Sequence, residues 1–79
     1  MNAKIVKKTY KNGQIYSYSE VYSGSYYMCV DYLEKQFEKP MPRGYSSSSI
    51  NGSIYNKIPS TRIVYNGKYC DLIYELVEE

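Results

Sequence analysis

The sequence contains no histidine, so the polar side chains that it offers for chemistry are mainly those of tyrosines, serines, lysines and two arginines. Histidine is the commonest general base, the commonest metal ligand and the usual partner of a nucleophilic serine or cysteine. The carboxylates lack metal-binding spacing, and the glycines form neither a phosphate-binding loop nor a dinucleotide fingerprint. We therefore expect no catalytic residues, no metal and no cofactor, and we rank an enzyme last among the functional classes.

The two cysteines, Cys29 and Cys70, stand far apart and without the spacing of a redox or metal-binding pair. Core packing is favoured over catalysis, because neither thiol has a histidine to activate it. A disulfide would require the helix that carries Cys29 to lie over the strand that carries Cys70. The sequence has no secretory signal pattern and no apolar run near the roughly 18 residues of a membrane span, so we expect a cytoplasmic protein with reduced thiols.

The first candidate binding surface is an aromatic and cationic sheet face near the N-terminus. Twelve tyrosines and one phenylalanine, with no tryptophan, place a hydroxyl on most of the aromatic mass. Such rings could stack on bases while lysines meet phosphates, but the same face could instead pack under a helix or form an oligomer interface. The residues expected on this face are Lys7, Tyr16, Tyr18 and Tyr22.

The second candidate surface is the segment that begins with the tripeptide Arg-Gly-Tyr at residues 43–45 and continues through a run of serines. It offers a cation, a ring, hydroxyls and backbone donors in one segment, which could grip a phosphate or a partner protein, or be only a connection. The candidate residues here, with one lysine further along, are Arg43, Tyr45, Ser46, Ser47, Ser48, Ser49, Asn51 and Lys57.

An Asn-Gly pair at residues 12–13 predicts the first hairpin, because a type I′ turn needs positive φ at both central residues. Strands over about 4–10 and 15–22 would flank a two-residue turn, with Tyr10 opposite Ile15. The same register places Thr9 opposite Tyr16 and Lys7 opposite Tyr18, which generates the aromatic face described above.

A second Asn-Gly pair at residues 66–67 predicts the last hairpin. A two-residue turn there places Ile63 opposite Cys70 and Arg62 opposite Asp71. Alternate residues of the final strand, from Cys70 to Leu76, then form a core face. A third pair, at residues 51–52, stands beside four serines and predicts either a weak hairpin or a mobile loop.

A helix over about residues 26–38 follows the first hairpin, and Ser23 or Ser25 could cap it. Its expected apolar stripe has helical spacing and is flanked by Cys29. The stripe consists of Tyr26, Val30, Leu33 and Phe37. Pro40 ends the helix, and residues 39–53 are expected to be a connection and mobile loop.

The 79 residues make one compact domain, 1–79, of the α+β class. We expect one antiparallel sheet of four to six strands with the single helix packed on one face, in the order ββαββ(ββ). The net charge of +2 is too small to demand a polyanionic partner, and it excludes a strongly acidic DNA mimic.

In size and composition the chain resembles small phage and mobile-element proteins, among them anti-CRISPR and other anti-defence inhibitors. It is short, rich in Lys, Asn, Ile and Tyr, and lacks both His and Trp. The resemblance rests on no motif and assigns no residue a role. It implies a non-enzymatic interaction protein that inhibits a host or defence-system protein, or a nucleoprotein complex, by docking on it.

The composition keeps a second functional class open. Tyrosine stacking together with Lys and Arg contacts would suit a binding module for single-stranded nucleic acid or for a small nucleotide signal. The sequence contains no RNP, KH or OB-fold signature. An unpaired sheet edge would also allow a homodimer.

Overall fold

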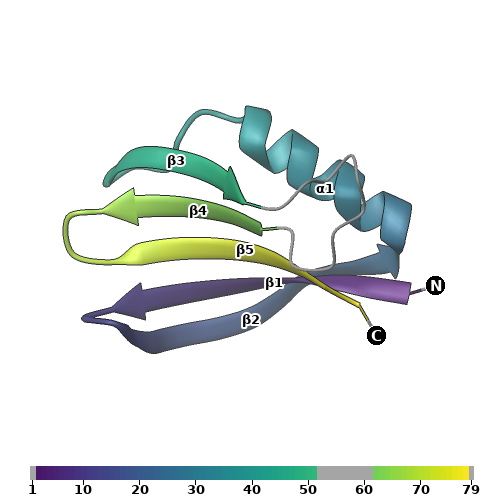
Figure 1. Cartoon of the computed structure of the whole chain (residues 1–79), viewed down its shortest axis with the longest axis horizontal. Coiled ribbons are helices and arrows are strands. Elements are labelled where there is room, and N and C mark those ends of the chain that lie inside the picture. Colours follow the sequence, from purple (N-terminus) through teal and green to yellow (C-terminus); the bar gives the residue numbers. More distant parts are fainter. Residues whose placement is uncertain (1, 52–61, 79) are drawn as a thin grey trace.

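The chain folds into one antiparallel sheet with a helix packed on one of its faces (Figure 1). The computed structural model describes residues 2–51 and 62–78, and side chains for 2–48 and 62–78. The elements of these described residues are β1 (Asn2–Lys11), β2 (Gln14–Ser25), α1 (Tyr26–Glu38), β3 (Tyr45–Asn51), β4 (Arg62–Gly67) and β5 (Asp71–Glu78). The predicted α+β class, the single antiparallel sheet and the ββα start are confirmed.

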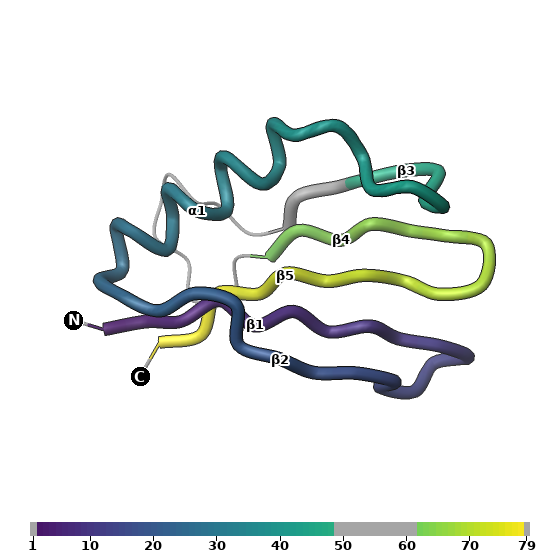
Figure 2. Tube along the Cα trace, turned by 180° about the vertical axis from the view of Figure 1, so that it is seen from behind, coloured from purple at the N-terminus to yellow at the C-terminus, as the bar shows by residue number. Residues whose placement is uncertain are grey.

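The strands lie in the order β2-β1-β5-β4-β3, and every neighbouring pair is antiparallel. The β1–β2 turn, the β4–β5 loop and the start of β3 therefore meet at one end of the sheet, at the left of Figure 1 and the right of Figure 2. We call this the loop end and define it by residues 10–16, 43–45 and 67–71. Both termini leave the sheet at the opposite end.

The turn between β1 and β2 has the predicted form. Asn12 has φ 55° and Gly13 has φ 78°, the left-handed values that a type I′ turn requires at both positions. Tyr10 pairs with Ile15 as expected, so the two-residue hairpin at this Asn-Gly pair is confirmed.

The rest of this hairpin differs from the predicted register because β2 carries two β-bulges. One extra residue, Tyr16, interrupts the pairing after Tyr10, and a second, Val21, lies between the partners of Val6 and Ile5. Thr9 pairs with Ser17 instead of Tyr16, and Lys7 pairs with Ser19 instead of Tyr18. The predicted pairing was wrong here because each bulge moves the register by one residue, which sequence alternation does not reveal.

Helix α1 has the predicted bounds and clear physical ends. The Ser25 hydroxyl accepts a hydrogen bond from the Met28 backbone N–H at 3.2 Å, so Ser25 is the N-cap. Lys39 is extended, with φ −68° and ψ 155°, as expected for a residue that precedes a proline.

The core lies between α1 and one face of the sheet. The buried helix residues are Tyr26, Cys29 and Leu33, whereas Phe37 is 39% exposed. The buried stripe is therefore rotated toward Cys29, which lies in the core cluster and not at its flank. No disulfide joins Cys29 to Cys70. The sheet contributes Ala3, Ile5, Ile63, Tyr65, Leu72, Tyr74 and Leu76 to the same cluster.

Tyr65 ties the end of the helix to β4. Its ring is 2% exposed, and its hydroxyl donates to the Gln36 carbonyl at 3.2 Å, while the Gln36 amide donates to the same hydroxyl at 3.4 Å. A buried tyrosine hydroxyl needs such partners. The contact also satisfies a carbonyl of the last helical turn.

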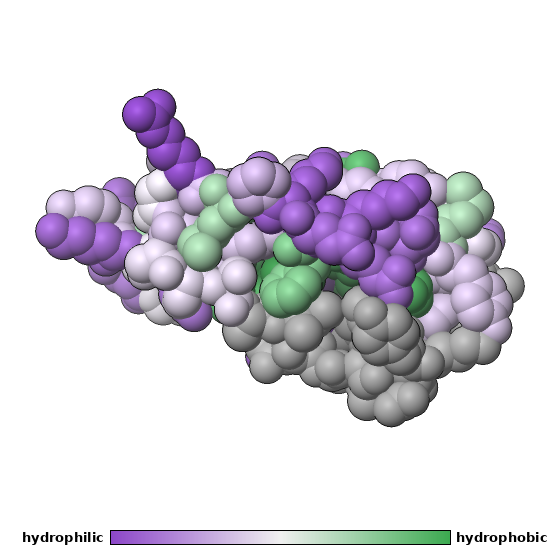
Figure 3. Space-filling view, turned by 90° about the horizontal axis from the view of Figure 1, so that it is seen from above, coloured by the Kyte–Doolittle hydropathy of each residue, from purple (hydrophilic) through white to green (hydrophobic). Residues whose placement is uncertain are grey.

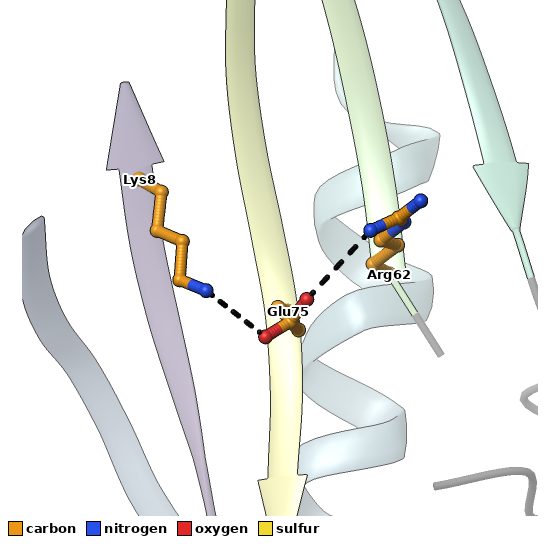
Figure 4. Close-up of polar contacts among 3 residues, drawn as sticks. All are labelled: Lys8, Arg62 and Glu75. Atoms are coloured by element: carbon orange, nitrogen blue, oxygen red, sulfur yellow. Dashed lines mark hydrogen bonds and ion pairs between the residues drawn. The ribbon is translucent and has the colours of Figure 1, made fainter. Parts of the chain in front are cut away.

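Ion pairs cross the sheet face that α1 leaves uncovered (Figure 4). Glu75 on β5 lies between Lys8 on β1, at 3.2 Å, and Arg62 on β4, at 3.9 Å. On the same face Val6 is fully buried outside the core cluster, and its partners on the neighbouring strands are Glu20 and Glu75. The charged side chains therefore connect the central strands on the side away from the core.

The predicted two-residue turn at the Asn-Gly pair 66–67 was wrong. Asn66 pairs with Asp71 and Ile63 pairs with Tyr74, so the hairpin is closed by residues 67–70. Neither Asn66 nor Gly67 has positive φ. The register shifts by four residues, an even number, so the predicted core face of β5 survives: Leu72, Tyr74 and Leu76 are all buried.

The longer loop requires glycine at position 67 because other atoms pack closely against it, and not because its φ is positive. A Cβ atom at Gly67 would lie 2.6 Å from the Cys70 carbonyl oxygen and 3.0 Å from Cδ1 of Tyr45. The Gly67 backbone N–H donates to Oδ1 of Asp71 at 3.3 Å. The loop therefore folds onto the one position in β4 that has no side chain.

Residues 45–51 of the expected connection and mobile loop form strand β3 instead. The serine run lies at the sheet edge, where a strand needs little to bury. Ser46 Oγ donates to the Asn66 carbonyl at 3.3 Å, and Asn66 Nδ2 donates to Ser47 Oγ at 3.4 Å. Hydroxyl contacts thus supplement the ladder. The hairpin proposed at residues 51–52 lies outside the described residues from Gly52 onward.

Substitution of Gly67 by alanine should be more costly than the same change at Gly24. The Gly67→Ala change forces a Cβ into the Cys70 carbonyl, and we expect it to lower the free energy of unfolding by about 1–3 kcal/mol. At Gly24 a Cβ would lie 3.5 Å from Met28 Sδ, an ordinary contact, so Gly24→Ala should stay within about 1 kcal/mol of wild type. Urea unfolding of both variants tests the difference, and equal losses would contradict the packing explanation.

Candidate functional site

The first predicted surface is not a single face in the structure. Tyr22 pairs with Ile5 on the helix side of the sheet, where its ring stacks on Tyr32 with centroids 5.0 Å apart. Tyr18 pairs with Lys8 on the opposite side. The bulge between them separates rings that strict alternation would have kept together.

Lys7 also belongs to the helix side. Its Nζ lies 5.9 Å from the centroid of the Tyr74 ring, and Tyr74 is 8% exposed. The ammonium therefore borders the core as a cation–π partner. Of the four predicted residues, only Tyr16 and Tyr18 remain strongly exposed, at 73% and 54%.

The second predicted surface is used mainly to hold the sheet together. Tyr45 is partly buried and lies on Tyr65, with ring centroids 6.3 Å apart. Its hydroxyl is 3.5 Å from Sγ of Cys70, within hydrogen-bonding distance. Arg43 is exposed at the loop end. Ser48 is an exposed residue of β3, the side chains of Ser49 and Asn51 are not described, and Lys57 lies outside the described residues.

Four of the nine exposed large hydrophobic side chains of the described residues lie on β2. Every residue from 14 to 21 is exposed, although this stretch is rich in tyrosine and aliphatic residues. Among the described residues β2 pairs only with β1, so it forms one edge of the sheet. We call the exposed hydrophobic set the β2 surface: Ile15 at 56%, Tyr16 at 73%, Tyr18 at 54% and Val21 at 37% exposure.

Two lysine–tyrosine pairs lie at the loop end. Nζ of Lys11 is 5.6 Å from the ring centroid of Tyr16, and Nζ of Lys68 is 5.4 Å from that of Tyr69. Tyr69 is 74% exposed. Between the two loops lies an open hollow of about 260 Å³, bordered by Asn12 and Gly13 on one side and by Lys68 and Tyr69 on the other.

Sequence reasoning did not select Lys11, Lys68 or Tyr69. The signal was present, since each lysine stands within two residues of an Asn-Gly pair and within five residues of its tyrosine partner. The antiparallel topology brings the two segments to the same end, although more than fifty residues separate them. Only the strand order reveals that juxtaposition.

A second hollow, of about 280 Å³, lies between α1 and β2. The stacked rings of Tyr22 and Tyr32 border it, together with the ion pair of Asp31 and Lys35, whose charged atoms are 3.0 Å apart. Seen from above, hydrophilic side chains form a band over α1 (Figure 3). This hollow and the one between the loops fall below the roughly 300–1,000 Å³ of typical small-molecule pockets.

The perturbed tyrosines are poor acids near neutral pH. The hydrogen bond with Cys70 and burial raise the pKa of Tyr45 to about 12, and burial raises the pKa values of Tyr32 and Tyr74. A general acid or base works best with a pKa near the operating pH. These three hydroxyls therefore stay protonated near neutral pH. Among the described residues no three potential metal ligands lie close enough together to hold an ion.

Comparison of the chain with protein-family models, with curated proteins and with solved structures finds no match. In the described part of the chain, no helix combines the length and apolar character needed to cross a membrane. The arrangement of side chains is therefore the basis for assigning a function. It provides exposed rings, aliphatic groups and cations on β2 and at the loop end.

The raised pKa of Tyr45 predicts a specific alkaline destabilisation. Because the folded pKa of about 12 lies above the ordinary value of 10.0, the protonated hydroxyl stabilises the fold fully below pH 10 and loses this effect as the pH rises toward 12. We expect wild type to lose more stability than Tyr45→Phe over this range, by a small amount because the ring is only partly buried. Urea midpoints measured across this range test it, and parallel pH profiles would contradict it.

Proposed function

We propose that the protein is a non-enzymatic interaction protein that docks on a partner protein or nucleoprotein complex through the β2 surface. One observation carries the proposal: residues 14–21 are all exposed, yet they include four of the large hydrophobic side chains left uncovered in the described structure. Hydrophobic residues gathered on one exposed edge are a common mark of a protein interface. Tyrosine is also among the residues that most often dominate binding energy.

The two bulges of β2 favour docking through side chains over extension of the sheet. Tyr16 and Val21 are the extra residues, so regular pairing between the bulges covers only Ser17 to Glu20. A bulge twists an edge strand and weakens its ability to receive another strand. The partner is therefore expected to supply pockets for rings and aliphatic groups.

Inhibition is the form that we propose for this docking, in line with the resemblance to small anti-defence proteins in size and composition. An inhibitor needs only to occupy a surface that its target uses, so it requires no catalytic group of its own. A cytoplasmic location suits this role, and the two thiols, which no disulfide joins, are compatible with a reducing compartment.

Tyr18→Ala should weaken retention of the partner. Tyr18 is 54% exposed, so its truncation removes contact area without opening the core. Loss of a hot-spot tyrosine costs about 2 kcal/mol or more, which corresponds to a fall in affinity of about 30-fold. The measurement is retention of a protein from nuclease-treated lysate by tagged wild type and variant, followed by titration of the purified partner.

Tyr27→Ala is the matched control, since Tyr27 is 65% exposed but lies on α1. A photoreactive residue at position 18 should cross-link to the retained protein, and one at position 27 should not. Equal retention of the partner by wild type and Tyr18→Ala would overturn the proposal. It would also be overturned if light scattering shows a homodimer and the residue at position 18 cross-links one copy of the chain to the other.

A further inference from the structure

We propose that the loop end is a binding site for single-stranded nucleic acid. Tyr16 and Tyr69 would stack on bases, and Lys11 and Lys68 would contact the phosphates that flank them. The site shares Tyr16 with the β2 surface, but Lys68 and Tyr69 lie in the hairpin of β4 and β5, so it can be tested separately from docking through Tyr18. It would let the protein contact the nucleic-acid strand of a nucleoprotein partner.

The rings are placed for stacking. Among the described side chains, Tyr16 and Tyr69 are the two most exposed of the large hydrophobic residues, at 73% and 74%. Each has a lysine ammonium over its ring, at 5.6 Å and 5.4 Å from the centroid. With the ammonium on one side of the ring, the other face can stack on a base, and the lysine supplies a cation for the backbone. Exposed rings with nearby cations are the combination used by sequence-tolerant single-strand binders.

The lysines of the loop end differ from other cations of the protein. Lys8, Lys35 and Arg62 each lie within 4.0 Å of a carboxylate. Within the described residues, no such ion pair forms at Lys11 or Lys68, so their charge is available to a phosphate. The nearby carboxylate of Asp71 accepts the Gly67 N–H, and Arg43 adds a third exposed cation at this end.

The backbone beneath the site is fixed on both sides. The left-handed turn at Asn12 and Gly13 positions Lys11, and the bond from Gly67 to Asp71 closes the loop that carries Lys68 and Tyr69. A binding group on a well-defined turn loses less conformational freedom when it binds. Lys68 and Tyr69 border the hollow between the loops, and Lys11 and Tyr16 border a second hollow that shares Asn12 with the first.

The size of the hollows favours a strand over a free nucleotide. The hollow between the loops is about 260 Å³ and the one beside Tyr16 is about 210 Å³, both open and below the usual range for pockets that enclose a small molecule. An open surface can still bind a strand, because a strand spreads its contacts over successive nucleotides. A duplex would hide its base faces from both rings.

The test is fluorescence anisotropy with a fluorescein-labelled 12-nucleotide oligothymidylate, at several salt concentrations. Two phosphate contacts predict that log K falls with log salt with a slope of about −1.4, taking about 0.7 per contact for single strands. Lys68→Gln should reduce the slope by about 0.7. Tyr69→Ala should weaken binding about tenfold, as loss of one stacked base does.

The control variants remove the same groups from α1. Lys35→Gln lowers the net charge by the same amount as Lys68→Gln, and Tyr27→Ala removes a ring that is 65% exposed, so both variants should bind like wild type. Thermal unfolding of each variant confirms that it is folded. The proposal would be overturned if wild type shows no salt-dependent binding or if Tyr69→Ala binds as well as wild type. It would also be overturned if duplex DNA, thymidine monophosphate or polyglutamate competes as well as the unlabelled single strand.

Discussion

The register of the central strands depends on the missing side chain at Gly67. The Cys70 carbonyl occupies the space where a Cβ would lie, so the observed loop, which has residues 67–70 between paired positions, requires a residue without a side chain at position 67. That register puts Ile63 beside Tyr74, and it also puts Arg62 beside Glu75. The absence of a side chain at Gly67 is therefore linked to the core contacts on one face of the sheet and to the ion pairs on the other face.

The two edges of the sheet have different character. Hydroxyl and amide contacts bind β3 to β4, and Tyr45 packs onto Tyr65, so this edge is coupled to the core. At the other edge β2 continues past the core with residues 14–21 exposed, and its bulges bend it. The core residues come from β1, β4, β5 and α1, whereas the exposed residues of the β2 surface lie on an edge outside the core cluster.

The sequence predicted those elements whose local chemistry is sufficient by itself. Asn12 and Gly13 adopt left-handed φ, Ser25 caps the helix, and Pro40 limits it, so the first turn and the bounds of α1 were predicted correctly, although β2 runs to Ser25, three residues beyond its predicted end. The identical dipeptide at 66–67 did not form the predicted turn, because the Cys70 carbonyl and the Tyr45 ring pack closely against Gly67 in a longer loop. No sequence pattern marked the two bulges of β2, and they place the tyrosines of the predicted face on different sides of the sheet. The lysine–tyrosine pairs of the loop end could be found only from the strand order.

The pairing of Ala3 with Glu78 has a practical consequence. The chain enters and leaves the sheet at neighbouring points, at the end remote from the β1–β2 turn and the β4–β5 loop (Figure 1). A tether, a fluorescent domain or a solid support attached at either point is directed away from the two lysine–tyrosine pairs. A short linker joining the two points would give a circular chain, which could then be opened elsewhere without separating β1 from β5.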